Sequence, residues 1–151
     1  MIASFALHPI GVLRTPFRTL ADCPRNGRLP DPPPPCAAHV LPEYGAGLAS
    51  LEGFSHLIVL YWLHQVDGAA LVLTPPFDRS PRGVFATRAP CRPNPIGLAV
   101  VAFDGFSDPL TLRLRYLDCL DETPLLDIKP YLPRTDSVPD ASMGWLLPAT
   151  N

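Results

Sequence analysis

The sequence predicts an all-β dominated fold: a small, closed or nearly closed β-barrel with short helical turns and long proline-rich loops. Proline makes up 21 of the 151 residues, and each interior proline costs a helix about 3 kcal/mol. Hydrophobic residues make up 47% of the chain and charged residues 17%, the reverse of a disordered composition. Several short runs are rich in aromatic and β-branched residues, which favour strands. No repeat or composition shift divides the chain, so residues 1–151 are expected to form a single domain.

The prolines are unevenly spaced, and their positions divide the chain into strands and loops. Residues 43–74 contain no proline, and 96–123 contain only Pro109. Because proline cannot donate a ladder hydrogen bond, these two windows are predicted to hold the main strands. The crowded segments are predicted to be loops, and they cover residues 30–35, 75–81, 90–95 and 124–139. Within them, Pro32–Pro35 predicts a short, stiff polyproline II spacer, with a role as an SH3-type ligand as the less favoured alternative.

The first half of the chain holds four predicted strands and one helical turn. Residues 5–14 and 36–41 are expected to be strands, and Leu48–Leu51 a single helical turn. The run Phe54–Leu63 is too continuous in its hydrophobicity for a half-exposed strand. It therefore predicts a strand that is buried on both faces or lies in a barrel wall. A second short strand is predicted at Ala69–Thr74.

The second half predicts a hairpin and one further short strand. Ile96–Phe106 is strongly apolar, and Leu110–Tyr116 alternates apolar with polar residues. With this alternation, the leucines are predicted to point to the core and the arginines to solvent. Gly105–Pro109 is predicted to join these strands as a hairpin loop, and Leu125–Ile128 to form a short strand.

Charge, cysteines and missing motifs exclude several classes of protein. The net charge is −2, so no global positive field steers the chain to nucleic acid. Four scattered cysteines without a C-x-x-C pair predict free thiols and a cytoplasmic protein. No apolar stretch approaches the 18 residues of a membrane span, and the dispersed histidines predict no metal site. No P-loop, G-x-G-x-x-G or G-x-S-x-G motif is present.

Three segments have residue types that can support binding or catalysis. Gly83–Gly97 packs arginines, prolines and glycines between apolar strands; it is either a preorganised binding loop or a stiffened crossover. Leu117–Tyr131 is rich in acids, and within it Asp127 and Lys129 share one face of an extended segment. They form either an ion pair or a tuned acid–base pair. His64–Gln65 ends the strongest strand, where a barrel mouth is expected.

The Gly83–Gly97 run resembles the signature loop of the TsaA-like family. Three more of that family's motifs occur in the same order, at Pro9–Phe17, Leu51–Leu57 and Asp121–Pro133, so the resemblance covers nearly the whole chain. It implies a single-sheet β-barrel and an S-adenosylmethionine-dependent tRNA adenine N6-methyltransferase. The implied acceptor is the exocyclic amino nitrogen of threonylcarbamoyladenosine next to the anticodon. The implied partners are the tRNA anticodon stem-loop and a second copy of the chain, with no membrane and no metal.

The same resemblance implies roles for individual residues. Arg88 would bind the cofactor's carboxylate through charge-assisted bonds. Asp127, adjusted by Lys129, or alternatively Tyr131, would accept the proton of the acceptor nitrogen. The residues that would contact S-adenosylmethionine are Asn26, Gly27, Arg28, His64, Gln65, Arg88, Leu98, Glu122, Thr123, Pro124 and Leu125. The residues that would line an RNA-contacting rim are Arg79, Arg82 and Arg92.

The chain departs from the family pattern in two places, and these keep other functions open. The family usually reads Pro-Arg-Gln-Pro where this chain has Pro24–Gly27 followed by the polyproline run. Longer members also carry a C-terminal domain that helps to hold tRNA, and we expect it to be missing here. The second hypothesis is therefore a methyltransferase of the same fold with another RNA or a small molecule as acceptor. The third is a barrel that binds cofactor or RNA without turnover.

Overall fold

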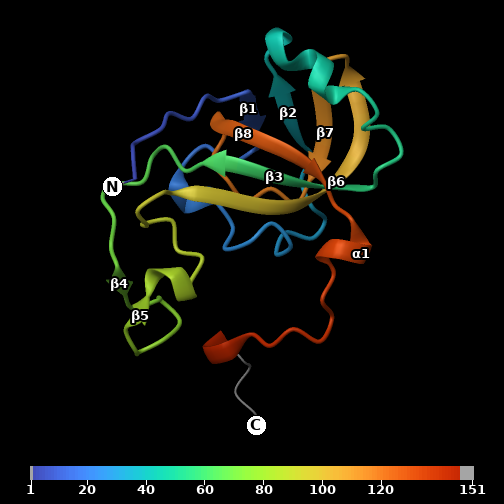
Figure 1. Cartoon of the computed structure of the whole chain (residues 1–151). Coiled ribbons are helices and arrows are strands. Elements are labelled where there is room, and N and C mark those ends of the chain that lie inside the picture. Colours follow the sequence, from blue (N-terminus) through green and yellow to red (C-terminus); the bar gives the residue numbers. More distant parts are fainter. Residues whose placement is uncertain (1, 147–151) are drawn as a thin grey trace.

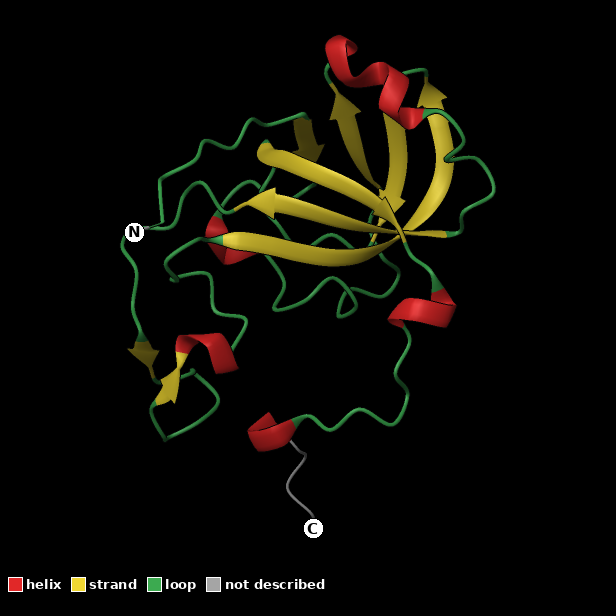
Figure 2. Cartoon of the chain, viewed as in Figure 1, coloured by secondary structure: helices red, strands yellow, loops and turns green. Residues whose placement is uncertain are grey.

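The computed structural model describes residues 2–146 and shows a closed barrel of six strands in the order β1-β2-β7-β6-β3-β8 (Figure 1). Every neighbouring pair is antiparallel. The barrel strands are β1 Gly11–Arg14, β2 Cys36–Val40, β3 His56–Trp62, β6 Ile96–Asp108, β7 Thr111–Arg115 and β8 Thr123–Pro130. The remaining elements are η1 Leu20–Asp22, η2 Pro42–Leu48, β4 Val72–Leu73, β5 Arg82–Gly83, η3 Val84–Ala86, α1 Pro133–Asp136 and η4 Gly144–Leu146. The predicted fold class is confirmed, and the helices are short and peripheral (Figure 2).

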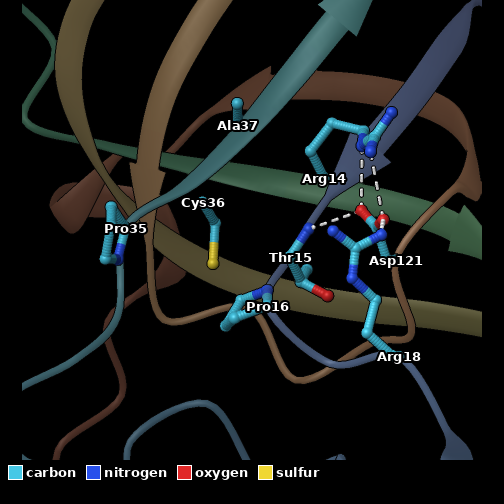
Figure 3. A pocket seen from close by; sticks show the side chains of 8 residues that line it. All are labelled: Arg14, Thr15, Pro16, Arg18, Pro35, Cys36, Ala37 and Asp121. Atoms are coloured by element: carbon cyan, nitrogen blue, oxygen red, sulfur yellow. Dashed lines mark hydrogen bonds and ion pairs between the residues drawn. The ribbon is translucent and has the colours of Figure 1, made fainter.

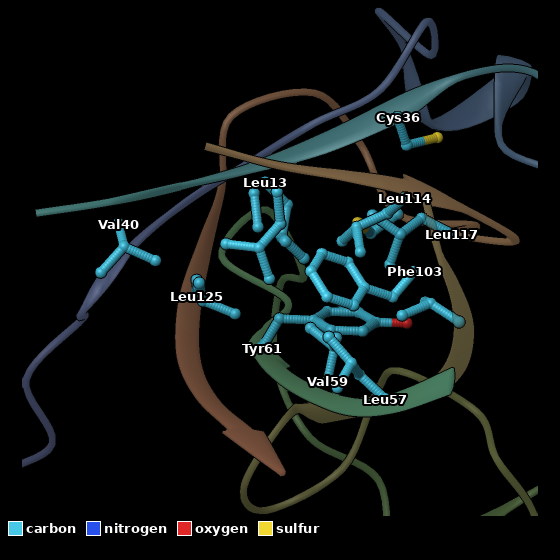
Figure 4. Packing of buried hydrophobic residues seen from close by; sticks show 14 of the residues in the cluster. Leu13, Cys36, Val40, Leu57, Val59, Tyr61, Phe103, Leu114, Leu117 and Leu125 are labelled. Atoms are coloured by element: carbon cyan, nitrogen blue, oxygen red, sulfur yellow. The ribbon is translucent and has the colours of Figure 1, made fainter. Parts of the chain in front are cut away.

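The core fills the barrel with every second side chain of its strands. In β3, Leu57, Val59 and Tyr61 are 0%, 0% and 2% exposed, while the residues between them are only partly buried. Figure 4 shows these side chains converging with those of Leu13 and Leu125. Burying one such aliphatic side chain contributes about 1.5–3 kcal/mol. Of the two predicted settings for this segment, the barrel wall is therefore the one observed.

Two predicted strands are much shorter than expected. Of residues 5–14, only Gly11–Arg14 forms a strand, and 5–9 are exposed. The pairing begins where the Ile10 N–H donates to the Leu125 carbonyl, 2.8 Å away. Of residues 69–74, only Val72–Leu73 pairs, and it does so with β5 in a two-stranded ribbon outside the barrel. Val72 is 63% exposed, so burial of its side chain does little to stabilise a longer ribbon.

The β6–β7 hairpin is tighter than predicted. β6 continues through Gly105 to Asp108, and the turn is formed by Pro109 and Leu110. The register shifts on both sides of Phe106, and Gly105 has a φ of 86°. Gly105 therefore marks a β-bulge and not a loop. The predicted orientation of β7 is confirmed, because its leucines are buried and Arg113 is exposed.

The prediction that residues 124–139 form a loop is wrong for their first part. β8 runs from Thr123 to Pro130, beyond the predicted Leu125–Ile128. Its two prolines lie second and last in the strand, where a missing donor removes no interior ladder bond. The predicted turn at Leu48–Leu51 has one hydrogen bond, from the Leu51 N–H to the Leu48 carbonyl. The 3-10 helix η2, which starts at Pro42, precedes that turn and was not predicted.

Three of the connections between barrel strands, which we call the first, second and third long connection in chain order, lie at one end of the barrel. They join β1 to β2 (15–35), β3 to β6 (63–95) and β7 to β8 (116–122). We call this the loop end; the opposite end holds η2, the β6–β7 turn and the exit to α1. The C-terminal segment returns to the second connection, where Trp145 stacks on Phe77 at 6.0 Å between ring centroids. No helix within residues 2–146 is long and apolar enough to cross a membrane.

Candidate functional site

The loop end collects the residues predicted to contact the cofactor. Asn26–Arg28 lie in the first long connection, His64–Gln65 and Arg88 in the second, and Glu122 in the third. Thr123–Leu125 follow as the first residues of β8, and Leu98 is the third residue of β6, which also starts there. Segments up to about 100 residues apart in sequence are thus brought to the same end of the fold.

The Asn26–Arg28 segment is held against the end of β7. The Asn26 side-chain oxygen accepts a hydrogen bond from the Arg28 N–H at 2.9 Å. A Cβ at Gly27 would lie 2.0 Å from the Tyr116 carbonyl oxygen, so only glycine fits there. The Arg28 guanidinium stacks over the Tyr116 ring at 3.8 Å and donates to the Val100 carbonyl at 3.2 Å. These contacts with the rest of the chain fix the position of the segment.

Arg88 lies within electrostatic range of a pair formed by the buried Tyr61 and the half-buried Asp118. The Tyr61 hydroxyl, inside the barrel, donates a 2.8 Å hydrogen bond to the Asp118 carboxylate. Burial raises the pKa of Asp118, against the opposing effects of the Tyr61 hydrogen bond and the Arg88 charge. Burial also raises the pKa of Tyr61 well above its usual value, so the hydroxyl remains a donor. The Arg88 side chain itself is exposed.

Asp118 was not predicted as a site residue. It belongs to the acid-rich segment Leu117–Tyr131 and lies between the apolar residues Leu117 and Cys119, both of which are buried. An acidic residue between two apolar residues is a pattern that can be recognised in the sequence. Its partner Tyr61, however, is 57 residues away in the chain, and only the closed barrel brings the two together.

The outer face of β8, β3 and β6 carries the predicted catalytic acid and an apolar floor. The register places Asp127 opposite Leu60, and Leu60 opposite Leu98. Directly opposed residues point to the same face, and strands lie about 4.8 Å apart. Asp127 and Leu98 are therefore separated by only one strand. Leu98 is 52% exposed and Ile96 is 41% exposed, so a flat ligand could pack on this face.

Asp127 and Lys129 form the ion pair that was one of the two alternatives. The Lys129 Nζ lies 2.7 Å from the Asp127 Oδ2, and the Asp127 Oδ1 accepts the Ile128 N–H at 2.9 Å. The hydrogen bond from Asp127 and its charge raise the pKa of Lys129. The Asp127 side chain is 43% exposed, so an acceptor can still reach its carboxylate.

Tyr131 lies two residues beyond Lys129, past the last residue of β8. It follows β8 at the end opposite the loop end, where its N–H donates to the His56 carbonyl at 3.2 Å. Its ring meets the His56 ring edge-on at 6.4 Å. At about 3.3 Å per strand residue, Tyr131 is roughly 25 Å along the strand from Thr123. Within one chain, the structure does not bring Tyr131 close to Arg88.

Two of the predicted cofactor residues turn their side chains inward. Thr123 and Leu125 are 1% and 0% exposed, and the Thr123 hydroxyl donates to the Leu120 carbonyl at 2.6 Å. Only their backbone groups can face a ligand. Glu122 is exposed and has a φ of 64°.

The three arginines predicted to line an RNA rim have different surroundings. Arg82 forms a 2.7 Å ion pair with Asp78 and packs over Trp145. The Arg92 guanidinium donates to the carbonyls of Thr87 and Ala89, at 3.0 and 3.2 Å, and so braces the signature loop from within. Arg79 is exposed.

Asp121 links β1 to the third long connection. Its carboxylate accepts hydrogen bonds from the Arg14 guanidinium at 2.9 and 3.1 Å and from the Thr15 N–H at 3.0 Å. The Arg18 guanidinium approaches from the other side, at 2.6 Å (Figure 3). Although burial acts against ionisation, these donors keep the pKa of Asp121 below its usual value.

The cysteines are free thiols, as predicted. Burial raises the pKa of Cys36 to about 11 and that of Cys119 to about 12, so neither is a reactive thiolate at neutral pH. Within residues 2–146, no group of three His, Cys, Asp or Glu residues could hold a metal ion.

Comparison with known proteins places the chain among methyltransferase-related sequences. Residues 12–137 match the family model described as the tRNA-methyltransferase O N-terminal domain. A probable S-adenosyl-L-methionine-binding protein of Archaeoglobus fulgidus is 44% identical over 139 residues, which is 92% of this chain and 37% of that protein. The tRNA (adenine(37)-N6)-methyltransferase of Escherichia coli is 37% identical over 161 aligned positions, covering 95% of this chain and 65% of that enzyme.

The solved structure of one relative has the same fold as this chain. The crystal structure of TrmO from Pseudomonas aeruginosa superposes with a TM-score of 0.78 and 38% identity, and covers 94% of this chain and 62% of that one. The chain thus spans less than two thirds of the length of each of these three relatives.

Proposed function

Since the chain belongs to the family of the tRNA-methyltransferase O N-terminal domain, we propose that it is an S-adenosylmethionine-dependent methyltransferase. Its proposed acceptor is the exocyclic amino nitrogen of threonylcarbamoyladenosine next to a tRNA anticodon. One observation carries the proposal: Asp127, the proposed base, lies on the same sheet face as Leu98, one of the predicted cofactor residues. The names of the A. fulgidus and E. coli relatives support the cofactor and the acceptor respectively.

The residues at the loop end suit the chemistry of S-adenosylmethionine. The exposed Arg88 guanidinium can bind the carboxylate through charge-assisted hydrogen bonds. The backbone of residues 122–125 can read the edge of the adenine, and Leu98 can cover its face. Because the Asn26–Arg28 segment is already ordered, little conformational entropy is lost when it contacts a ligand. When bound, the cofactor supplies an electrophilic methyl group on a sulfonium centre.

Asp127 is the proposed general base. The acceptor nitrogen is acylated and therefore poorly nucleophilic, so removal of its proton during attack lowers the barrier. Lys129, at 2.7 Å, fixes the orientation of the Asp127 carboxylate. Asp127 is favoured over Tyr131 because it lies one strand from Leu98, whereas Tyr131 follows the far end of β8. Alignment of the acceptor nitrogen, the methyl group and the sulfur supplies much of the remaining acceleration.

We also propose that the protein is a homodimer and acts in the cytoplasm, where tRNA is modified. The resemblance to the TsaA-like family, which implies a second copy of the chain as a partner, supports the dimer. Sedimentation equilibrium at the concentration used for activity should give the mass of two chains. A monomer that retains full activity would exclude the dimer as a functional requirement.

Nucleoside mass spectrometry tests the proposed reaction. The purified protein is incubated with tRNA from a strain that lacks this modification and with S-adenosylmethionine carrying a labelled methyl group. The proposal predicts a labelled methyl group on threonylcarbamoyladenosine. Cofactor binding without tRNA labelling would favour the same fold acting on another acceptor. Absence of cofactor binding would exclude both methyltransferase functions.

A further inference from the structure

A row of arginines crosses the outer face of β1, β2 and β7. In the strand register, Arg14 of β1 is opposite Ala37 of β2, and Ala37 is opposite Arg113 of β7. Arg115 lies two residues further along β7 and therefore on the same face. Arg18 joins Arg14 around Asp121, and Arg28 joins Arg115 around the Tyr116 ring. We call this set the arginine strip; it consists of Arg18, Arg14, Arg113, Arg115 and Arg28.

The strip faces solvent along its length. The residues that alternate with it, Leu13, Leu112 and Leu114, are all 0–1% exposed and point inward. The side chains of Arg18, Arg14 and Arg115 are 71%, 41% and 39% exposed. Ala37, at the centre of the row, is too small to separate Arg14 from Arg113. Two shallow pockets, one on each side of the Pro35–Cys36 segment, are lined by these arginines.

The strip keeps a positive charge in a chain whose net charge is −2. Asp121 is shared between Arg14 and Arg18, and Asp104 pairs with Arg115 at 2.7 Å. Glu122 lies 3.8 Å from Arg14. Five guanidinium groups therefore face three carboxylates. The Arg113 and Arg28 guanidinium groups donate to backbone carbonyls, those of Asp104 at 2.7 Å and Val100 at 3.2 Å, and neither forms an ion pair of its own within residues 2–146.

One end of the strip reaches the candidate site. Arg28 is bonded to the Val100 carbonyl, and Val100 is two residues from Leu98 on β6. The other end, at Arg14 and Arg18, lies where β1 ends, and Arg14 is 3.8 Å from Glu122, another of the predicted cofactor residues. The strip therefore runs around the barrel wall at the loop end, and predicted cofactor residues lie beside both of its ends.

We propose that the arginine strip binds the sugar–phosphate backbone of the RNA acceptor and guides the target nucleotide to the loop end. This inference rests on the proposed tRNA acceptor. Guanidinium groups bind phosphate bidentately, and a row of them suits a linear polyanion. An RNA is favoured over a membrane surface because the centre of the strip, between Arg14 and Arg113, holds only the small residue Ala37 and no large apolar group for insertion into a bilayer.

The substitution Ala37→Glu tests the strip without removing any native contact. It places a carboxylate between Arg14 and Arg113, where both arginines can pair with it, so the fold should be retained. Ala37→Gln is the uncharged control of the same size. Ala46→Glu adds the same charge at an exposed position of η2, which follows the opposite end of β2. Binding of total tRNA is measured over a series of salt concentrations, and binding of S-adenosylmethionine by calorimetry.

Ala37→Glu should weaken tRNA binding at least about ten-fold and make the dependence of log K on log salt shallower by about one. Both controls should stay within about two-fold of the unmodified protein, and all variants should bind the cofactor equally. If Ala37→Glu binds tRNA like the unmodified protein, the strip is overturned while the proposed methyltransferase remains. If the unmodified protein binds the cofactor but no tRNA, or binds anionic vesicles in preference to tRNA, the strip and the proposed acceptor both fail.

Discussion

Asp127 of β8 and Leu98 of β6 lie on either side of Leu60 in one cross-strand row of the barrel's outer face. In this row the predicted catalytic acid is one strand away from a predicted cofactor residue. Tyr131 lies outside the row, because it follows the far end of β8. The two candidate bases can therefore be distinguished by where they lie.

Replacing Asp127 with Asn should lower turnover about 10²–10⁴-fold and leave the affinity for S-adenosylmethionine within about two-fold. The amide keeps the shape of the side chain but cannot accept a proton. Single-turnover methyl transfer and calorimetry provide the two readouts. Asp140→Asn, at an exposed position outside the site, is the matched control. Equal losses of turnover and cofactor affinity would rule out a base.

Arg88 and Arg92 should behave differently although they belong to the same loop. Arg88→Ala should weaken cofactor binding roughly 10–100-fold, because one charge-assisted contact contributes about 1.5–3 kcal/mol. It should hardly change the unfolding midpoint, because the Arg88 side chain is exposed. Arg92→Ala should instead lower the free energy of unfolding by about 1–2 kcal/mol, since its guanidinium holds two loop carbonyls. Denaturant unfolding and calorimetry on both variants make the comparison; a reversed pattern would refute these roles.

Asp118→Asn should make stability less dependent on pH. Burial raises the pKa of Asp118 in the folded state, so the folded protein binds its proton more tightly than the unfolded chain does. The stabilisation from this proton is complete below the unfolded pKa of about 3.9 and is lost as the pH rises through the folded pKa. Asn can still accept the Tyr61 hydrogen bond and carries no charge. The variant should match or exceed the original stability at neutral pH, and a clear loss there in denaturant titrations would contradict this account.

Asp121→Asn should show the opposite dependence. The pKa of Asp121 is lowered in the folded state, so its contribution is present above the unfolded pKa of about 3.9 and disappears as the pH falls through the folded value. The variant should lose about 2 kcal/mol at neutral pH, an estimate reduced because Arg14 and Arg18 are themselves partly exposed. At acidic pH the free energies of unfolding of the two proteins should become equal. A stability difference that persists unchanged into acid would show that packing, and not charge, is responsible.

Sequence patterns predicted the fold where side-chain alternation was strong. The run at Phe54–Leu63 and the alternation at Leu110–Tyr116 correspond to β3 and β7. Boundaries failed where the deciding factor was not local. Pro124 and Pro130 look incompatible with a strand, yet they lie near the ends of β8. Gly105 looks like part of a turn, yet it sits in a bulge that lets β6 continue.

The geometry of the candidate site could not be predicted from the sequence. Motif resemblance selected Arg88, Asp127 and Leu98, but only the register shows which of them share a face. Asp118 was not predicted as a candidate site residue, because its hydrogen-bond partner Tyr61 is distant in sequence. The arginine strip was missed for the same reason, since Arg14 and Arg113 become neighbours only when β2 pairs with both of their strands.

The most direct test of the central claim is mass spectrometry of tRNA nucleosides after incubation with the protein and S-adenosylmethionine carrying a labelled methyl group, with Asp127→Asn run in parallel. The account predicts labelled N6-methylated threonylcarbamoyladenosine with the original protein and a rate about 10²–10⁴-fold lower with the variant. Unlabelled tRNA in the presence of demonstrated cofactor binding would contradict the proposed acceptor.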